Sequence, residues 1–406
     1  MERVYLCVVM NWSVKLAKSL RKDKTLQRHY FIQVICQLAI ALCICTVLIS
    51  SFLIRGFEKT IEDKIFNFWS HIRISNLGNS VNPIGESPVR IDTKSIDPKN
   101  IVKITPVINK GALLKHEENI EGIVLRGIDI GAKQAFDYTR PQQLSYLKES
   151  EVPLILSNRT MDKLNLHLGD PLLINIIDST AKSLRAKVVN TYSTNIEEFD
   201  EQIALTDIKV IQKINRWDSA EYSWVEVQAR TKDDITALAE RLYTQLPDVA
   251  VDTIYSIYPQ LFDWLALMKK NELIIFIVML IVAIVNIMST ISIFVIEKTK
   301  LIGMLKVLGA KNKSLYDMMY YQVAMIILRG VLIGNGLAIA LTAILYYLKP
   351  IKLDPSIYYV SYAPILFDWK AAIFINLLTI ITCLISAYLP LRTISKISPI
   401  KVVEFS

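Results

Sequence analysis

Long uninterrupted runs of apolar residues dominate the pattern along the chain. Four of them are long enough to cross the hydrocarbon layer, which takes about 20 residues of helix: Tyr30–Ile54, Leu273–Ile296, Gln322–Leu348 and Ala371–Leu389. Backbone polar groups in lipid must bond within their own segment, so each run is predicted to be a transmembrane helix. The third run contains the single charged side chain among the four, Arg329.

Basic residues cluster in the segments before the first run, between the second and third, and after the fourth. In these segments 15 Lys and Arg residues stand against five acidic residues, whereas the whole chain has a net charge of +8. Such an excess in short segments marks the cytosolic side of a membrane and does not indicate a nucleic-acid partner. We expect both termini and the loop 297–321 in the cytosol, with residues 55–272 and 349–370 on the other side.

The ends of the chain are predicted to be cytosolic. In residues 1–29, Trp12, Leu16 and Leu20 recur at helical spacing among basic residues, which suits an amphipathic helix on the inner leaflet. The apolar stretch there is short and no small-residue cleavage site follows, so a cleavable signal peptide is not expected. Residues 390–406 form a tail.

The segment 55–272 is too long for a loop and is predicted to fold as a domain inserted between the first two spans. Apolar residues at helical spacing extend the first span outward to Phe68 and precede the second span from Leu261. The pieces between these helical stalks that resemble strands are His71–Ser75, Ile123–Gly127, Leu154–Ser157, Leu172–Ile177, Lys187–Tyr192 and Trp224–Ala229. The amphipathic helix candidates are Arg159–Leu166, Asp207–Asn215 and Asp233–Leu246. The expected fold class is therefore a membrane α-helical protein with four transmembrane helices and a large α+β domain between helices 1 and 2.

Signatures of enzymes are absent from the sequence. No HExxH, GxSxG, GxGxxG or GxxxxGK[ST] occurs, and the adjacent Glu197 and Glu198 are predicted to lie in a solvated loop. No cysteine lies between Cys45 and Cys383, which excludes a disulfide framework and a CxxC metal site. We expect no catalytic, cofactor-binding or metal-binding residue in this chain, so any ATP hydrolysis must come from another chain.

The most distinctive motif lies in the loop after the second span, where Glu297–Ala310 reads EKTKLIGMLKVLGA. Leu301, Met304, Leu305 and Leu308 are predicted to form one apolar face of a helix. Gly309 stands where a helix C-terminus favours glycine. Two interpretations stay open: a basic helix resting on the membrane surface, or a short helix docked in a groove of a cytosolic partner.

This motif resembles the signature of the FtsX/MacB-type permease superfamily, E[KR]xx[DE]IGxL[KR]xLGA, although Leu301 stands where the family has an acid. Other segments resemble the lipoprotein-releasing permeases of the LolC/LolE type. They are RGFEKTIEDKIF from Arg55, HIRI from His71, GIVLRGID at Gly122–Asp129, NLHLGD at Asn165–Asp170, KLDPSIYYVSYAP from Lys352, and the ending from Leu389. The resemblance extends from about Lys15 onward. Val323 and Ile327 stand where relatives carry glycine.

The resemblance implies a permease subunit of a type VII ABC transporter in the inner membrane of a Gram-negative bacterium. Its function would be to extract lipoproteins from the outer leaflet for delivery to the outer membrane. The implied partners are a LolD-like cytosolic ATPase that holds ATP and Mg²⁺, a second permease copy or paralogue, lipoproteins and a LolA-like periplasmic carrier. In LolC-type relatives a long loop recruits that carrier, and the corresponding stretch here, Asp178–Leu184, is short. The alternatives are a MacB-like efflux or mechanotransmission permease and an FtsX-like regulator of a cell-wall hydrolase.

Three groups of residues are candidates for function. Coupling to the ATPase is assigned to Glu297, Lys298, Gly303, Met304, Leu305, Lys306, Gly309 and Ala310. An acyl-chain cavity, or packing between permeases, is assigned to Phe52, Phe57, Leu273 and Phe276. Arg329 either snorkels to the membrane surface or pairs there, or it contacts substrate. Gly330 and Gly334 predict a close seam between two helices.

Overall fold

The computed structural model describes residues 27–79, 87–91, 96–129, 151–177 and 182–392. The chain forms two compact units. The helical unit comprises Met1–Phe57, Leu265–Ile351 and Ala363–Ser406, and the α+β unit comprises Glu58–Trp264 and Lys352–Tyr362. The predicted amphipathic helix in residues 1–26, the tail from residue 393 and residues 178–181 of the short loop lie outside the described residues.

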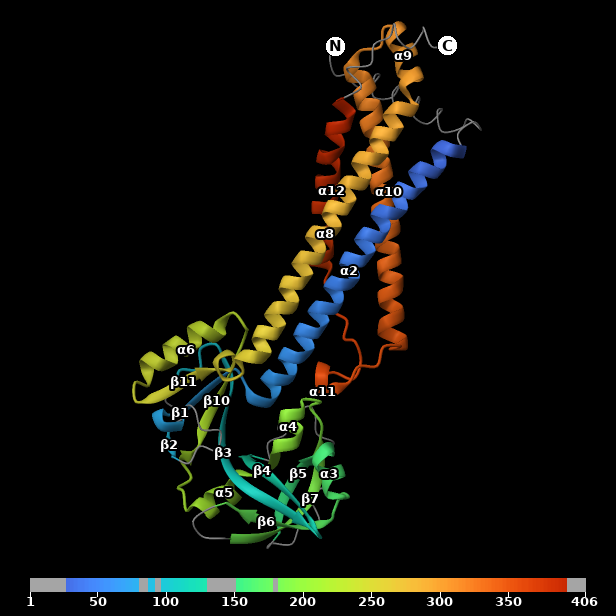
Figure 1. Cartoon of the computed structure of the whole chain (residues 1–406). Helices are drawn as coiled ribbons and strands as arrows, with labels where there is room; N and C mark the ends of the chain where they lie inside the picture. Colours follow the sequence, from blue (N-terminus) through green and yellow to red (C-terminus); the bar gives the residue numbers. More distant parts are fainter. Residues whose placement is uncertain (1–26, 80–86, 92–95, 130–150, 178–181, 393–406) are drawn as a thin grey trace. The chain divides into compact units, whose positions relative to one another are not determined.

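The helical unit is built from long apolar helices (Figure 1). They are α2 (Gln27–Trp69), α8 (Pro259–Glu297), α10 (Asn312–Leu348) and α12 (Trp369–Leu391), together with the short α9 (Thr299–Val307). In the described part of the chain, the four long helices are apolar enough to cross a membrane, with mean hydropathy of 2.0 to 2.8 in their apolar stretches. Each contains one of the four predicted runs. The predicted helical continuations are also confirmed, because α2 reaches Trp69 and α8 begins at Pro259.

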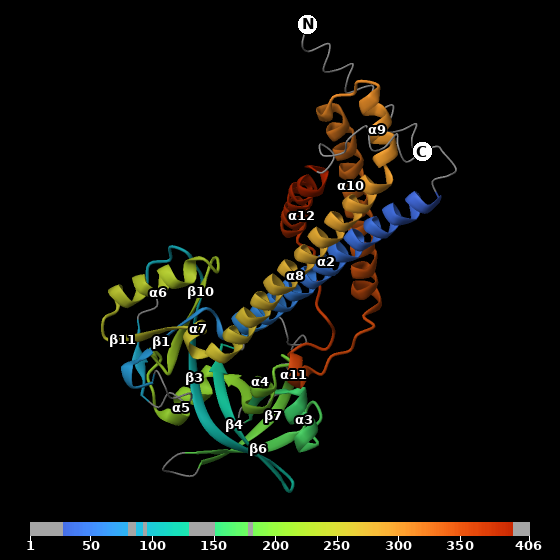
Figure 2. The same cartoon turned by 45° about the horizontal axis from the view of Figure 1, so that its top comes forward.

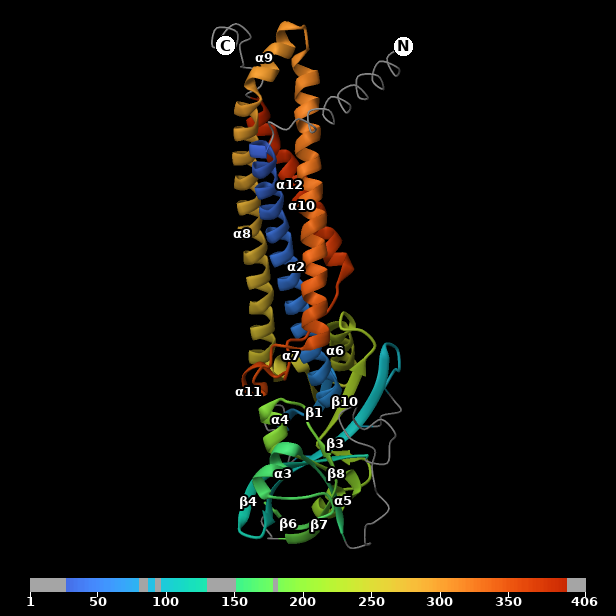
Figure 3. The same cartoon turned by 90° about the vertical axis from the view of Figure 1, so that its right-hand side faces the viewer.

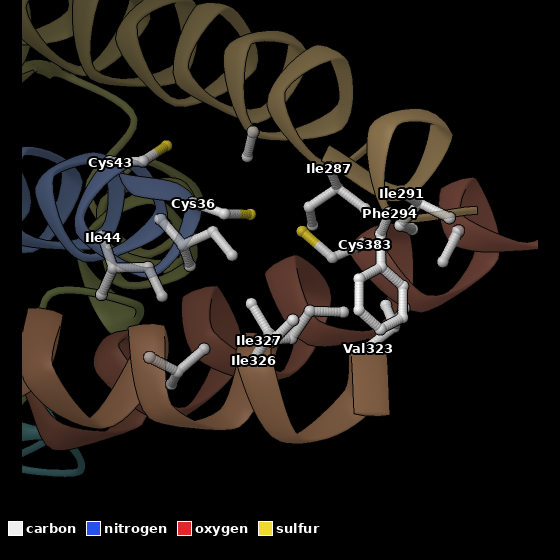
Figure 4. Packing of buried hydrophobic residues seen from close by; sticks show 14 of the residues in the cluster. Cys36, Cys43, Ile44, Ile287, Ile291, Phe294, Val323, Ile326, Ile327 and Cys383 are labelled. Carbon is white, nitrogen blue, oxygen red and sulfur yellow. The ribbon is translucent and has the colours of Figure 1, made fainter. Parts of the chain in front are cut away.

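Small residues let α10 approach α2 closely. A Cβ added at Gly330 would lie 2.9 Å from Cβ of Ile40, and one added at Gly334 would lie 2.7 Å from the carbonyl oxygen of Ala41. The predicted glycine seam is therefore confirmed, with α2 as its partner. Figure 4 shows the apolar side chains that meet beside this seam, among them Cys36, Ile287, Ile327 and Cys383.

A reciprocal amide pair links α10 to α12. Nδ2 of Asn335 donates to Oδ1 of Asn376, and Nδ2 of Asn376 donates to Oδ1 of Asn335, both at 2.9 Å. Each Nδ2 also donates to a carbonyl one turn earlier, that of Val331 or Ala372, at 2.8 Å. Because an unpaired amide is costly in apolar surroundings, this pair fixes the register of the two helices.

The α+β unit is centred on a nine-stranded sheet with the order β11-β1-β10-β3-β4-β8-β5-β7-β6. The strands are β1 (Ile72–Asn76), β3 (Ile101–His116), β4 (Asn119–Ile128), β5 (Val152–Ser157), β6 (Pro171–Ile176), β7 (Lys182–Tyr192), β8 (Ile203–Asp207), β10 (Trp224–Ala229) and β11 (Val249–Thr253). The first half of β3 pairs with β10, and its second half pairs with both β4 and β6. The pairing with β6 closes the six strands β3, β4, β8, β5, β7 and β6 into a barrel. A separate pair consists of β2 (Val89–Arg90) and β9 (Glu221–Tyr222).

The α+β unit also contains short helices. They are α3 (Asn158–Leu164), α4 (Glu197–Gln202), α5 (Ile208–Asn215), α6 (Asp234–Gln245), α7 (Ile254–Ile257) and α11 (Pro355–Tyr358), and Leu77–Asn79 forms the 3₁₀ turn η2. Helix α6 lies against β10 and β11 (Figure 2). Its Ile235, Leu238 and Leu242 are buried. Helix α5 lies against β3 and β4 and approaches so closely that a Cβ at Gly127 would lie 3.0 Å from Cα of Ile208.

A buried ion pair joins β4 to β10. Nη2 of Arg126 lies 2.8 Å from both carboxylate oxygens of Glu226, and it donates to the carbonyl of Phe68 at 2.9 Å. Nε1 of Trp224 donates to the same carboxylate at 3.1 Å, and the Arg126 guanidinium lies 4.2 Å from the ring centroid of Trp69. Breaking such a pair leaves a buried charge uncompensated, so these contacts fix the end of α2 to the sheet.

The six predicted strands and three predicted helices of this unit are all present, with boundaries that differ by a few residues. Strands β2, β3, β8, β9 and β11 and helices α4, α7 and α11 were not predicted. Lys103, Pro106 and Lys110 interrupt the apolar alternation of β3. Because β3 changes partners along its length, its buried positions follow no single period, which explains the omission.

Candidate functional site

The motif Glu297–Ala310 forms α9 and its flanks, which connect α8 to α10 (Figure 3). The helix ends at Gly309, whose φ of +89° lies in the left-handed region. The Gly309 N–H donates to the Lys306 carbonyl at 3.0 Å, and the Ala310 N–H donates to the Leu305 carbonyl at 2.9 Å. Together these two bonds form a Schellman motif, so the predicted role of Gly309 as a helix terminator is confirmed.

Helix α9 has apolar residues on two sides. Ile302 is fully buried in the core of the helical unit, and Leu305 packs against that core. Met304, Val307 and Leu308 are exposed, Leu308 by 82%. The inner side anchors α9, and the outer side leaves an apolar surface open on the molecule.

The single apolar face expected from the sequence is therefore divided. Leu305 faces the core, whereas Met304 and Leu308 point outward, because Ile302 rather than Met304 enters the core. The other residues assigned to coupling lie at the ends of the helices or differ in burial. Glu297 is the last residue of α8, and Lys298 directly precedes α9. Gly303 is buried, Lys306 and Ala310 are half-buried, and Gly309 is exposed.

Arg55 links three helices at the other end of the helical unit. Its Nη1 lies 2.6 Å from Oδ2 of Asp368, which precedes α12, and its Nε lies 3.9 Å from Oε1 of Glu272 on α8. Asp368 also caps α12 by accepting bonds from the Lys370 N–H at 2.9 Å and the Ala371 N–H at 3.1 Å. The Ala371 N–H and the Arg55 guanidinium together lower the pKa of Asp368 below its usual value.

The segment before α12 packs directly on α2 next to Arg55. A Cβ at Gly56 would overlap the carbonyl oxygen of Pro364. The Leu366 N–H donates to the Phe52 carbonyl at 3.1 Å, and the rings of Phe52 and Phe367 lie 5.5 Å apart. Sequence reasoning missed this cluster, because its members on α2 lie more than 300 residues from those before α12 and form no local motif with them.

The four residues assigned to an acyl-chain cavity or a permease interface lie in different surroundings. Phe52 and Phe57 are buried, Phe276 packs against the core, and Leu273 is 58% exposed. Leu273 belongs to an open apolar surface along α8, here called the α8 stripe. Its members are Leu273, Ile274, Ile277, Val278, Ile281, Val282 and Val285.

Arg329 is half-buried on α10, directly before Gly330 of the glycine seam. No hydrogen bond or ion pair joins it to another residue in the described ranges. An arginine in an apolar helix requires oxygen partners, which a lipid phosphate or another chain can supply. Val323 and Ile327, where the family has glycine, are buried in the core on the same helix.

The described residues bring no three metal-ligating side chains together. Cys36, Cys43, Cys45 and Cys383 are free thiols buried among apolar residues.

Comparisons with known proteins agree with this arrangement. The FtsX-like permease C-terminal family matches residues 273–399, from the start of the predicted second span to the tail. The lipoprotein-releasing system transmembrane protein LolC of Neisseria meningitidis serogroup B is 21% identical over 397 residues, or 92% of this chain and 94% of that protein. The corresponding LolE of Haemophilus influenzae is 21% identical over 388 residues, or 90% of this chain and 92% of that protein. The chain is therefore similar to FtsX-like ABC permeases of the LolC/LolE kind.

Two solved structures are similar to part of this chain. The extracellular domain of the ABC-type transporter YknZ from Gram-positive bacteria is 14% identical, with a TM-score of 0.31 over 45% of this chain and 99% of that one. The periplasmic region of MacB from Actinobacillus actinomycetemcomitans is 14% identical, with a TM-score of 0.33 over 50% of this chain and 97% of that one. The family indicates a transporter subunit, and the relatives and apolar helices support a bacterial inner-membrane protein.

Proposed function

We propose that this permease extracts lipoproteins from the outer leaflet of the inner membrane for delivery to the outer membrane. The observation that carries the proposal is the match to lipoprotein-releasing LolC and LolE proteins, which covers at least nine-tenths of the chain. The distribution of basic residues supports cytosolic termini and a periplasmic α+β unit. A second permease copy or paralogue and a LolA-like carrier complete the proposed system.

Extraction requires an energy source because the acyl chains of a lipoprotein favour the membrane. Each CH₂ group contributes about 0.8 kcal/mol of membrane affinity, so a lipoprotein with several chains does not leave spontaneously at a useful rate. We assign ATP and Mg²⁺ binding to a separate LolD-like ATPase, and no cofactor to this chain.

Helix α9 is the proposed contact with that ATPase. Met304, Val307 and Leu308 offer an exposed apolar surface, and buried Ile302 together with the Schellman motif holds the helix in place. A helix with one exposed apolar side suits a groove on a partner protein. Only Lys298 separates α9 from α8, which continues as one helix of 39 residues, about 58 Å long. A displacement of α9 would therefore be transmitted along α8.

Substitution of exposed residues on α9 tests the docking proposal. We expect Leu308→Asp and Met304→Asp to abolish co-purification of the ATPase while the permease stays folded, because neither side chain belongs to the core. Leu348→Asp is the matched control, since Leu348 is 71% exposed at the far end of α10. Retention of the ATPase by both α9 variants would refute the docking surface.

A reconstituted release assay tests the function itself. Proteoliposomes containing the permease, its ATPase and a fluorescent triacylated lipoprotein should transfer the lipoprotein to a soluble carrier only when ATP is added. A photo-crosslinker at Leu273, in the α8 stripe, should capture the acylated substrate, and one at Ile373, 67% exposed on α12, is the control. ATP hydrolysis without transfer would contradict lipoprotein release and favour the regulatory or efflux alternatives.

A further inference from the structure

The α+β unit contains two neighbouring cavities, which share two lining residues. The larger has a volume of about 540 Å³ and is lined from α4, α7, the first turns of α8 and the segment 357–359. The smaller has a volume of about 210 Å³ and is lined from the end of α2, β3, β4 and α4. Glu198 and Tyr258 line both, and we refer to the pair as the α4–α8 cleft.

Glu198 differs from the other glutamates of its helix in having no cationic partner. Glu197 pairs with Arg159 on α3, and Glu201 lies 2.7 Å from the same arginine and 3.1 Å from Lys163. Among the described residues, none forms an ion pair or hydrogen bond with the Glu198 side chain. No Lys or Arg belongs to the lining of either cavity in this part of the chain. Glu198 is therefore the one charged side chain in the described lining of the cleft, and it has no cationic partner there.

Glu198 is exposed to solvent and shares the cavity lining with aromatic residues. The rings of Trp264 and Tyr359 lie 6.1 Å apart at an angle of 77°, and Tyr258 lies 5.5 Å from Phe199. Burial raises the pKa of Tyr359, and the negative charges of Glu198 and Glu197 add to the rise. Aromatic faces beside a carboxylate attract an ammonium or guanidinium group.

The smaller cavity offers groups that match a peptide bond. Nε1 of Trp69 is buried and donates to no acceptor among the described residues, and the side chains of Asn109 and Gln202 line the same cavity. An indole N–H can bond a carbonyl oxygen, and a carboxamide can both donate and accept. A peptide group presents one carbonyl and one N–H.

The absence of basic residues from this lining disfavours an aminophospholipid as the occupant. The headgroup of such a lipid carries a phosphate close to its ammonium group. Within the cleft that phosphate would meet Glu198 with no described Lys or Arg to balance it. A basic side chain on a neutral polypeptide backbone does not carry this second charge.

We propose that the α4–α8 cleft binds an extended polypeptide segment carrying a Lys or Arg side chain. The cationic group contacts Glu198 between Tyr258, Trp264 and Tyr359, and an adjacent backbone carbonyl accepts a hydrogen bond from Nε1 of Trp69. The segment belongs to the polypeptide of the transported lipoprotein, so the inference rests on the proposed function.

Fluorescence anisotropy with the full permease and its ATPase in nanodiscs tests this assignment. The probes are three fluorescein-labelled peptides, Gly-Ser-Gly-X-Gly-Ser, in which X is Lys, norleucine or Glu. We expect Glu198→Gln to weaken binding of the Lys peptide about 10-fold and to leave the norleucine peptide unchanged. Glu201→Gln is the matched control on the same helix, because its partners lie on α3, and should bind all three peptides like the unmodified protein.

Trp69→Phe removes the N–H and keeps an aromatic ring. We expect it to weaken the Lys and norleucine peptides by the same factor, because both offer the same backbone carbonyl. Equal affinity of the unmodified protein for Lys, norleucine and Glu peptides, or an unchanged affinity in Glu198→Gln, overturns the proposal. The proposal is also overturned if the unmodified protein retains an aminophospholipid, Glu198→Gln loses that lipid, and the peptide affinity is the same in both proteins. That result would assign the cleft to lipid. The measurement includes no release step, so it distinguishes failure of this inference from failure of lipoprotein release.

Discussion

His71 is expected to make the stability of the α+β unit depend on pH. Its Nδ1 accepts a hydrogen bond from the Ala229 N–H at 2.9 Å, and its ring meets the ring of Phe66 edge-on at 4.4 Å. The residue is only 7% exposed, and burial lowers its pKa from 6.5 to about 4. Neutral imidazole is therefore the form that the folded state accommodates.

The sign of the effect follows from proton binding. Between pH 6.5 and pH 4, His71 binds a proton more readily in the unfolded chain than in the folded one. The contribution of His71 to the free energy of unfolding is therefore fully present above pH 6.5 and is lost as the pH falls toward 4. Between pH 7.5 and pH 4.5 the loss is about 2.5 kcal/mol, which increases the opening of the local structure roughly 70-fold.

Hydrogen exchange of the β10 amides Trp224–Ala229 in the full chain measures this opening, after correction for the intrinsic pH dependence of exchange. His71→Asn is the matched control, because the Asn side-chain oxygen can accept the Ala229 bond and does not titrate. The difference between the two proteins removes the contribution of other titrating groups. Parallel pH profiles from pH 7.5 to pH 4.5 would refute the assignment.

Three further predictions concern the helical unit. Gly334→Ala places a Cβ 2.7 Å from the Ala41 carbonyl and should destabilise the seam by about 1–3 kcal/mol, whereas Gly336→Ala, with no atom within 4 Å, should not lower the melting temperature. Asn335→Leu and Asn376→Leu should each lower the free energy of unfolding by about 0.5–2 kcal/mol. Thermal unfolding in detergent should show that the double variant is destabilised by less than the sum of the two single variants. Additive losses would contradict coupling between the two amides. Gly309→Ala should destabilise the end of α9 by about 1 kcal/mol because its φ is +89°, and Gly309→Asn should cost less. Faster hydrogen exchange at Ala310 would report this fraying, and equal exchange in both variants would contradict the strain argument.

Features that depend on neighbouring residues along the chain could be predicted from the sequence. The length and apolarity of a membrane helix are set by its own residues, so the four spans were located, and the Gly309 terminus follows from one residue type at one position. The strands with regular alternation, such as Trp224–Ala229, were also found. Strand β3 was missed because its three partners come from distant parts of the chain.

The candidate sites were only partly accessible from sequence. Residues 297–310 were identified as a coupling element, but which side chains of α9 are free for a partner depends on Ile302 entering the core. The coupling role itself stays a prediction. Nothing local relates Arg55 to Asp368 or distinguishes Glu198 from Glu197, because the partners that decide each case lie on other elements.

By itself, the sequence determined where this chain can enter a membrane, the expected orientation of its ends and the family to which it is similar, since apolarity, charge and motif are properties of consecutive residues. The tertiary structure decided which apolar residues remain exposed and which polar groups lack a partner. Phe52 and Leu273 are both apolar, yet one is enclosed by Phe367 and the other is open on α8. The physical reason is that burial and compensation of charge depend on neighbours that only the fold brings within a few ångströms.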